Sequence, residues 1–281
     1  MNIMAEFIKI GNEIRIRPNL DGISYDLVNS KVYDLKWNNM EGYGYFVENG
    51  DLNMPNKLYK LEEDNIFIKR VLTYFNSENS GKTTGILLSG TKGTGKTMLS
   101  KRIALESGLP IIVVDTRFPA RVLNKVFKGF TTPVCMIFDE IEKNDNYWDT
   151  RDLLGFLDGV EANAKKLVLM TCNETDNIDN NMFDRCSRIR YFKKYEANSN
   201  SIFVRSMAED KGVKNIDEVV NFIIKHIEVK SFDNILAFLD EVVLFEDVPL
   251  DKLIKDMNIS SDGTIRTGIN KSNNEEVIEL F

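Results

Sequence analysis

The sequence predicts an α/β protein in which helices cover both faces of a parallel β-sheet. Three observations predict it. Short apolar runs alternate with amphipathic segments between residues 85 and 192, and this alternation is typical of βαβ units. A glycine-rich loop separates the first of these runs from the helical pattern that follows it. From residue 196 onward the patterns are helical, which predicts a second, helical unit at the C-terminal end.

Residues 1–57 are expected to form a small β-rich domain that contacts a partner. Apolar and charged residues alternate at 14–17, and tyrosine and valine alternate with other residues at 43–47, which is the period of a half-buried strand. Asn49-Gly50 follows the second stretch, and this dipeptide favours the tight turn of a hairpin. The next helix is expected to begin at Asp64, a suitable N-cap, and to continue to Phe75.

The α/β core is expected at residues 58–195. Five strands are predicted, at 85–89, 110–115, 134–139, 166–171 and 187–192. Their nearly continuous apolar character is typical of parallel strands that are covered on both faces. Helices are predicted between them, at 96–106 and 118–130 among others. Aromatic residues at 118, 127 and 130 are interpreted as one packed helix face, and a substrate-contacting loop is the alternative.

The C-terminal region is expected to form a four-helix unit at residues 196–258. The helical patterns cover 202–211, 216–227, 232–245 and 250–257. Ser231 is the expected N-cap of the third helix. His226, the only histidine of the chain, lies in an apolar helix and is interpreted as structural. Residues 259–281 are predicted to be a flexible tail, because they are polar except at their end.

Composition limits the classes of function. The chain has 281 residues and a net charge of −7, so no global basic field attracts nucleic acid. A single histidine excludes histidine-rich metal sites. Cys135, Cys172 and Cys186 form no C-x-x-C pair and are interpreted as reduced thiols that pack as small hydrophobes.

The location is expected to be cytoplasmic. No apolar run is long enough to span a membrane, and the N-terminal residues do not resemble a signal peptide. We therefore expect no membrane association. The richness in Asn, Lys and Ile is typical of an AT-rich genome, such as that of a bacterium or of a phage in its host.

A phosphate-binding loop is predicted between the first core strand and its helix. It matches the pattern G-x-x-x-x-G-K-[ST] in full, with the residues Gly90, Thr91, Lys92, Gly93, Thr94, Gly95, Lys96 and Thr97. Glycines let successive backbone N–H groups point at phosphates, with the positive end of the helix behind them. Lys96 adds a charge, and the Thr97 hydroxyl is a ligand for Mg²⁺. The expected ligands are therefore ATP and Mg²⁺.

A second sequence, Gly81-Lys82-Thr83-Thr84, resembles the end of this loop. It lacks a glycine five positions before Gly81, where Asn76 stands. It also precedes the first predicted strand. We interpret it as a surface loop.

The third predicted strand ends in two acids, Asp139 and Glu140. The carboxyl ends of parallel strands meet at one edge of the sheet, next to the phosphate loop. Asp139 is therefore expected to hold Mg²⁺ through water. Glu140 is expected to orient and polarise the attacking water, because the chain has no histidine available there to act as the base.

With these motifs in place, residues 57–258 resemble the AAA+ ATPases, which implies a P-loop NTPase fold with a three-layer αβα core and a helical lid. The strand ending at Asn173 is similar to the sensor-1 strand of that family, whose asparagine contacts the γ-phosphate or the attacking water. Arg185 and Arg188 keep the spacing of the two arginines that reach into a neighbouring subunit's site. Both are implied catalytic residues, and which one is the arginine finger stays open.

Details of the resemblance favour the AAA clade. Residues 153–160 contain a Leu-Asp-Gly-Val turn, as in the branch of the mitochondrial respiratory-complex assembly chaperone. No arginine begins the third C-terminal helix, unlike clamp-loader and initiator lids. The segment between residues 115 and 139 leaves little room for an aromatic pore loop. The resemblance implies a homo-oligomeric ring, expected to be a hexamer, in which ATP hydrolysis remodels a protein partner.

A nucleic-acid-associated ATPase, such as a loader or a replication or transcription accessory factor, is the alternative. It rests on two features. One is a basic cluster at Arg185, Arg188, Arg190, Lys193 and Lys194. The other is the tail at 277–281, which resembles the Leu-Phe-ending peptides that bind sliding clamps.

Overall fold

A computed structural model describes most of the chain. The described residues are 7–16, 23–54, 62–115, 118–128, 130–143, 150–159, 164–176, 178, 180–195, 201–227, 231–257 and 259. The chain divides into two compact units, residues 1–197 and 198–281, and each is considered by itself. Of the predicted tail at residues 259–281, only residue 259 belongs to the described part, so the prediction for its last five residues lies outside that part.

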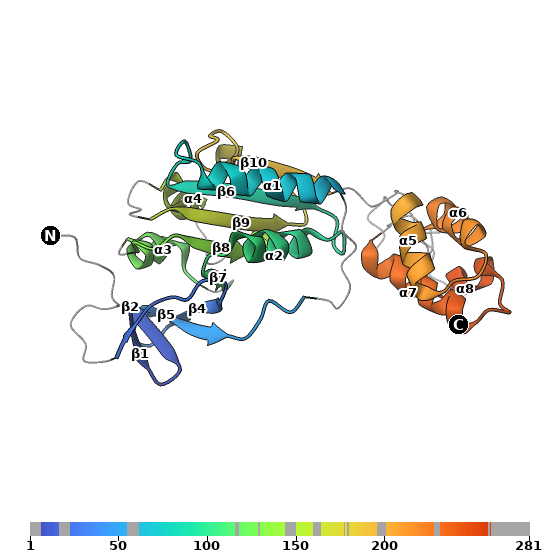
Figure 1. Cartoon of the computed structure of the whole chain (residues 1–281), viewed down its shortest axis with the longest axis horizontal. Coiled ribbons are helices and arrows are strands. Elements are labelled where there is room, and N and C mark those ends of the chain that lie inside the picture. The colour runs from blue at the N-terminus through green and yellow to red at the C-terminus, as the bar shows by residue number, and fades with distance from the viewer. Residues whose placement is uncertain are drawn as a thin grey trace, which may run out of the picture. The chain divides into compact units, whose positions relative to one another are not determined.

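The first unit is built on a ten-stranded sheet (Figure 1). Six neighbouring strands are parallel. In spatial order they are β10 (Tyr191–Tyr195), β6 (Thr83–Gly90), β9 (Lys166–Cys172), β8 (Val134–Phe138), β7 (Ile111–Val114) and β4 (Val32–Asn38). Four antiparallel strands continue the sheet, namely β5 (Tyr43–Asn49), β2 (Glu13–Ile16), β1 (Phe7–Ile10) and β3 (Ile23–Tyr25). The predicted α/β class with a parallel core is confirmed.

Two separate hydrophobic cores lie on the two faces of the sheet. On one face, α1 (Glu62–Asn76) and α2 (Lys96–Ser107) pack on Ile86 and Leu88 of β6. On the other, α3 (Ala120–Phe127) and α4 (Thr150–Asp158) pack against a cluster that contains Leu87. Successive residues of a strand point to opposite faces, so the apolar run of β6 contributes side chains to both cores. This is the predicted three-layer arrangement, and Figure 1 shows the helices lying along the sheet.

The N-terminal strands extend this sheet and do not form a separate domain. β4 pairs in parallel with β7, from Val32 opposite Ile111 to Leu35 opposite Val114. Phe46 lies in the same core cluster as helix α3. The boundary expected at residue 57 therefore falls inside one compact unit.

The hairpin turn is also placed differently from the prediction. β4 and β5 are joined at residues 39–42, where the Asn38 side chain accepts hydrogen bonds from the N–H groups of Met40 and Glu41. Gly42 there has a φ of +70°. Asn49-Gly50 ends β5 instead, and neither residue has a positive φ. The turn is therefore stabilised by the Asn38 side chain, as is common for asparagine in turns, and not by Asn49-Gly50 as predicted.

Two local predictions are corrected. The last core strand begins at Tyr191 and not at Ser187, because residues 186–188 form a turn in which the Arg188 N–H donates to the Arg185 carbonyl at 2.9 Å. Asp64 lies inside α1 and does not cap it. It accepts hydrogen bonds from Lys193 at 2.6 Å and from Tyr195 at 2.8 Å.

The segment Gly81-Lys82-Thr83-Thr84, which was expected to be a surface loop, is only half a loop. Gly81 and Lys82 are exposed, but Thr83 and Thr84 are buried and begin β6. Because threonine is polar, the apolar run predicted a strand that begins at Gly85. The observed strand begins two residues earlier, at Thr83.

Phe118, Phe127 and Phe130 are all buried, as their predicted packing requires. Only Phe127 lies in α3, however, so the three residues do not form one helix face. Cys135 and Cys172 are buried as expected. Cys186 is exposed, so its interpretation as a core residue is wrong. It lies in the turn that displaces the last strand.

The second unit contains four described helices. They are α5 (Ser201–Lys211), α6 (Ile216–His226), α7 (Phe232–Leu244) and α8 (Leu250–Asp256). Ser231 caps α7 as predicted, accepting a hydrogen bond from the Asn234 N–H at 3.1 Å. Phe222 stacks on both Phe238 and His226, so the histidine has the structural contact expected of it. Among the described helices, none has the length and apolar character needed to cross a membrane.

Lys166 is a buried cation at the start of β9, with 3% of its surface exposed. Its ammonium donates to the Phe156 carbonyl at 3.0 Å, near the end of α4, and lies 3.7 Å from the centre of the Phe156 ring. Burial lowers the pKa of Lys166 from 10.5 to about 8. Between pH 8 and 10.5 the folded chain has therefore lost a proton that the unfolded chain keeps, and stability rises with pH through this window.

We expect this group to change the pH dependence of stability. Between pH 7 and 9.5, the free energy of unfolding of the wild type should rise by about 2 kcal/mol relative to Lys166→Met, whose side chain does not titrate. Urea denaturation of both proteins at each pH measures the difference. Parallel stability curves would show that Lys166 keeps its ordinary pKa in the folded chain.

Candidate active site

The predicted phosphate loop lies at the carboxyl edge of the parallel sheet, between β6 and α2. Gly90 ends β6 with a φ of +140°, and a Cβ there would lie 2.0 Å from the Tyr195 carbonyl oxygen. Gly95 is the N-cap of α2 with a φ of +97°, a conformation that favours glycine. Lys96 and Thr97 form the first turn of α2. Backbone N–H groups at this helix start and the helix dipole make an anion site.

The remaining loop residues differ in exposure. Thr94 is buried, and its hydroxyl donates to the Thr91 carbonyl at 2.7 Å, which closes the loop on itself. Thr91 and Lys92 are exposed, and Gly93 has a φ of +77°. The loop therefore has a defined shape with two side chains facing solvent.

Lys96 is buried within the loop. Its ammonium donates to the carbonyls of Gly90 at 2.5 Å and Thr91 at 2.9 Å, and to the Asn173 side-chain oxygen at 3.2 Å. Burial lowers the pKa of Lys96, and the nearby carboxylates of Glu142 and others oppose that shift. A phosphate oxygen is a stronger acceptor than a carbonyl because it is charged. Lys96 is thus placed to exchange loop carbonyls for phosphate.

Asp139 faces the start of α2. Its Oδ1 accepts hydrogen bonds from the Thr97 hydroxyl at 3.0 Å and from the Thr171 hydroxyl at 2.5 Å. A hydroxyl and a carboxylate this close together form an oxygen donor set that suits Mg²⁺. The residues present therefore fit the ion that the loop motif predicts.

Thr171 connects the two acids, and sequence reasoning did not identify it. Its hydroxyl donates to Asp139 and accepts from the Glu140 N–H at 2.9 Å. Glu140 has a φ of +52°, which costs on the order of 1 kcal/mol for a residue with a side chain. The one available signal was a polar residue at a fully buried position of an apolar strand.

The side chain of Glu140 is held from two sides. Lys143 donates to its Oε2 at 2.5 Å, and the Asn173 Nδ2 donates to its Oε1 at 3.0 Å. These two hydrogen bonds, with that from Lys143 first, lower the pKa of Glu140. A carboxylate with a lowered pKa is a weak proton acceptor. The arrangement suits the orientation and polarisation of a water molecule more than full proton removal.

Asn173 lies one residue beyond β9, between the loop and the acids. Its side chain contacts Lys96, Glu140 and Glu142. Glu142 was also missed by sequence reasoning, because it lies in a short 3-10 helix (Ile141–Lys143) whose direction the sequence pattern does not give. The structure thus joins the predicted loop, Asp139, Glu140 and Asn173 in one hydrogen-bond network.

The two arginines have different environments. Arg188 makes a bidentate pair with Asp158 in the same chain, at 2.8 and 2.9 Å, and its side chain is 12% exposed. It also donates to the Asn181 carbonyl at 2.6 Å. Arg185 is exposed. Of the pair, Arg185 is the one whose guanidinium is available to a second molecule.

The basic cluster does not form one cationic surface. Lys193 is paired with Asp64, and Arg188 with Asp158. The Arg190 guanidinium lies 3.6 Å from the centre of the Tyr74 ring. Residues that are consecutive in an irregular segment and an edge strand point in different directions, so the charge seen in the sequence is divided among separate contacts.

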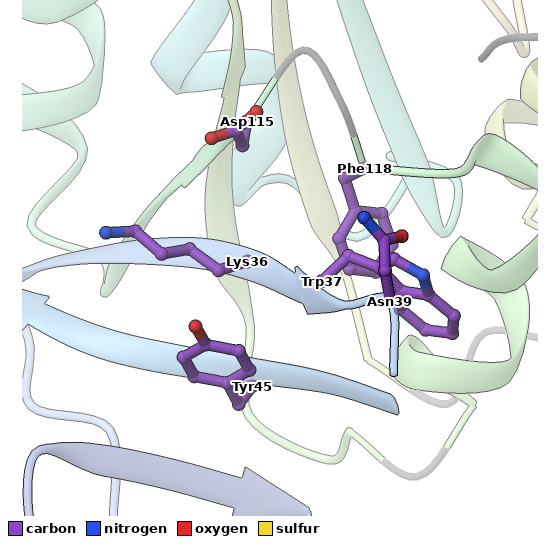
Figure 2. Close-up of a pocket in the computed structure, with 6 residues that line it drawn as sticks. All are labelled: Lys36, Trp37, Asn39, Tyr45, Asp115 and Phe118. Carbon is purple, nitrogen blue, oxygen red and sulfur yellow. The ribbon is translucent and has the colours of Figure 1, made fainter. Parts of the chain in front are cut away.

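A pocket of about 170 Å³ lies at the β4–β5 hairpin and the segment after β7 (Figure 2). It is lined by Lys36, Trp37, Asn39, Tyr45, Asp115 and Phe118. The Trp37 and Phe118 rings pack edge to face, with centroids 5.7 Å apart, and close one side. The hairpin contributes most of this lining, so the pocket belongs to the N-terminal extension of the sheet.

Comparison with known proteins gives one family. Residues 86–194 match the model described as "ATPase family associated with various cellular activities (AAA)". The chain is similar to "ATP-dependent zinc metalloprotease FtsH" of Heterosigma akashiwo, with 35% identity over 34% of this chain and 18% of that protein. It is similar to "Putative cell division cycle ATPase" of Plasmodium falciparum, with 32% identity over 45% of this chain and 12% of that one.

A third relative is "Nuclear valosin-containing protein-like" of Mus musculus, 30% identical over 37% of this chain and 15% of the mouse protein. The matched part is less than a fifth of the length of each of these relatives. This sequence has one histidine, whereas an H-E-x-x-H zinc site needs two.

Proposed function

Since the chain belongs to the AAA family of ATPases through its domain at residues 86–194, we propose that it binds ATP with Mg²⁺ and hydrolyses the terminal phosphoanhydride bond. One observation carries the proposal. A single hydrogen-bond network joins the phosphate-loop residues Lys96 and Thr97 to Asp139, Glu140 and Asn173. Every group that phosphoryl transfer to water needs in one chain is therefore within reach of the loop.

The residues divide the chemistry between them. The loop N–H groups and Lys96 bind the phosphates, and Thr97 and Asp139 would hold Mg²⁺, which neutralises phosphate charge when bound. Glu140 orients and polarises the attacking water. Asn173 shares contacts with Lys96 and Glu140, so it lies between the phosphate side and the water side of the reaction.

We further propose that the chain works as a homo-oligomeric ring, with a hexamer as the expected size. The support is that Arg185 is exposed while Arg188 is held by Asp158. An exposed arginine that completes a neighbour's site stabilises the charge of the transition state. This assigns the arginine finger to Arg185 and a structural role to Arg188.

The two arginines give opposite predictions. Arg185→Ala should lower turnover by at least 10³-fold and leave the melting temperature unchanged, because an arginine finger contributes about 10³–10⁵ in rate. Arg188→Ala, the matched control, should lower the free energy of unfolding by about 2 kcal/mol, because it leaves Asp158 without its partner. Phosphate release and thermal melts measure both.

Mixing variants tests whether Arg185 acts across subunits. A mixture of Arg185→Ala and Lys96→Ala chains should regain activity, since the first supplies an intact nucleotide site and the second an intact arginine. Full turnover by Arg185→Ala alone would contradict the assignment.

The function of the ring is proposed to be the remodelling of a protein partner. The pocket in Figure 2 is the proposed contact site for the partner. Four of its six lining residues lie outside the part of the chain that matches the ATPase family, so they are free to be specific to this protein. A Glu140→Gln chain, expected to hold ATP, should retain the partner in a pull-down that Lys96→Ala does not. Turnover that rises with single-stranded DNA and falls steeply with salt would instead favour the nucleic-acid-associated alternative.

A further inference from the structure

Glu142 makes the shortest contacts to Asn173 in the site. Its Oε1 accepts two hydrogen bonds from that residue, from the backbone N–H at 2.8 Å and from the side-chain Nδ2 at 2.7 Å. The contact from Asn173 to Glu140 is longer, at 3.0 Å. Glu142 therefore holds both the backbone and the side chain of Asn173.

These contacts select one orientation of the Asn173 amide. Its Nδ2 faces two carboxylates, and its Oδ1 faces the Lys96 ammonium at 3.2 Å. The flipped amide would place its oxygen against carboxylates, which only accept, and its NH₂ group against an ammonium, which only donates. Two carboxylates and one cation thus determine which end of the amide faces Lys96 of the phosphate loop.

The Glu142 carboxylate lowers the stability of the fold. Its Oε2 is buried and has no hydrogen-bond partner among the described residues. A buried acceptor left unpaired costs more than its partner atom gains from one extra hydrogen bond. A second acid beside Glu140 also adds negative charge where phosphates must bind. Stability alone does not account for this residue.

We propose that Glu142 is a positioning residue for the ATPase reaction, which holds the Asn173 amide in register while Glu140 is occupied with the attacking water. The proposal rests on the proposed function. When Glu140 turns to water, its own hydrogen bond to Asn173 weakens. Glu142 then keeps Nδ2 in place, so Oδ1 stays directed at Lys96 and the phosphate side.

Substitutions at Glu142 separate positioning from charge. Glu142→Gln keeps an oxygen that accepts both hydrogen bonds from Asn173 and removes the charge. Glu142→Ala removes the acceptor, and Glu142→Leu does the same with a side chain that still fills the space. We expect the Gln variant to keep kcat within about threefold of wild type, and the Ala and Leu variants to lose about tenfold. The Kd for a fluorescent ATP analogue should change by less than twofold in all three.

The double variant supplies the deciding comparison. If Glu142 acts through the Asn173 side chain, Glu142→Ala added to Asn173→Ala should reduce kcat no further than Asn173→Ala alone. Losses that multiply in full would overturn the proposal. So would a change confined to KM, or a lowered melting temperature with kcat unchanged, because a merely structural residue would give that result. If the Ala variant does not fold, the Leu variant enters the same cycle.

A second measurement does not depend on turnover. In a ¹⁵N-labelled chain, the side-chain NH₂ signals of Asn173, assigned by their loss in Asn173→Ala, should shift in Glu142→Ala and stay close to wild type in Glu142→Gln. Signals that are unchanged in Glu142→Ala would overturn the positioning role. A wild-type chain that releases no phosphate would sink the proposed function instead, and the amide signals would still decide the contact.

Discussion

A Glu140→Gln chain should bind ATP with the wild-type Kd and hydrolyse it about 10²–10⁴-fold more slowly, because a positioned base contributes a factor of that size. The amide keeps the volume and the ability to accept a hydrogen bond from Asn173, but without the negative charge it polarises water poorly. Single-turnover hydrolysis with a fluorescent binding assay on the same samples separates the two effects. The chain should remain loaded with ATP.

The matched control is Glu174→Gln, an acid-to-amide change at an exposed position next to Asn173. It should turn over at the wild-type rate. Glu140→Gln activity within a few fold of that control would remove Glu140 from the reaction and leave water activation without its proposed residue.

Lys96→Ala should weaken ATP binding by about 10²–10³-fold, because a buried, charge-assisted contact to phosphate is lost. The same change leaves the Gly90 and Thr91 carbonyls without their donor, so the loop itself should become less ordered. Isothermal titration with ATP and Mg²⁺ measures the affinity. Lys69→Ala, an exposed lysine on α1, is the control and should bind as the wild type does.

Retained binding in Lys96→Ala, within tenfold of the control, would mean that nucleotide does not enter this loop as proposed. A chain that loses binding only because it unfolds would show a lowered melting temperature and a changed circular dichroism spectrum. The Lys96→Arg variant then keeps the test open, because it preserves the charge but not the compact ammonium group.

The phosphate loop and the acid pair are parts of the site whose positions follow from local sequence. A loop motif between a strand and a helix places Gly90 to Thr97 by short-range geometry alone. Asp139 and Glu140 follow because the carboxyl ends of parallel strands share an edge. Neither inference requires knowledge of distant contacts, and the structure brings these residues together.

Contacts between distant segments were the main source of error. The parallel pairing of β4 with β7 joins residues 32–35 to 111–114, and no local pattern predicts such a pairing. The turn before β10 forms around Arg188, whose partner Asp158 lies 30 residues earlier. The resemblance to the AAA+ ATPases therefore implied a common role for two arginines whose surroundings differ.

Thr171 and Glu142 illustrate the same limit inside the site. Each is a polar residue of ordinary type, and its role depends on which groups the fold brings within 3 Å. A buried threonine in an apolar strand gave a weak signal. Glu142 gave none, because a short 3-10 helix redirects the chain after the acid pair.

Phosphate release by the wild-type chain, measured with ATP and Mg²⁺ over a range of protein concentrations, tests the central claim most directly. The site predicts steady turnover, and its rate per chain should rise with protein concentration because Arg185 must come from a second subunit. Phosphate release should disappear in Lys96→Ala. Release no greater than that of Lys96→Ala at every concentration would contradict ATP hydrolysis at this site.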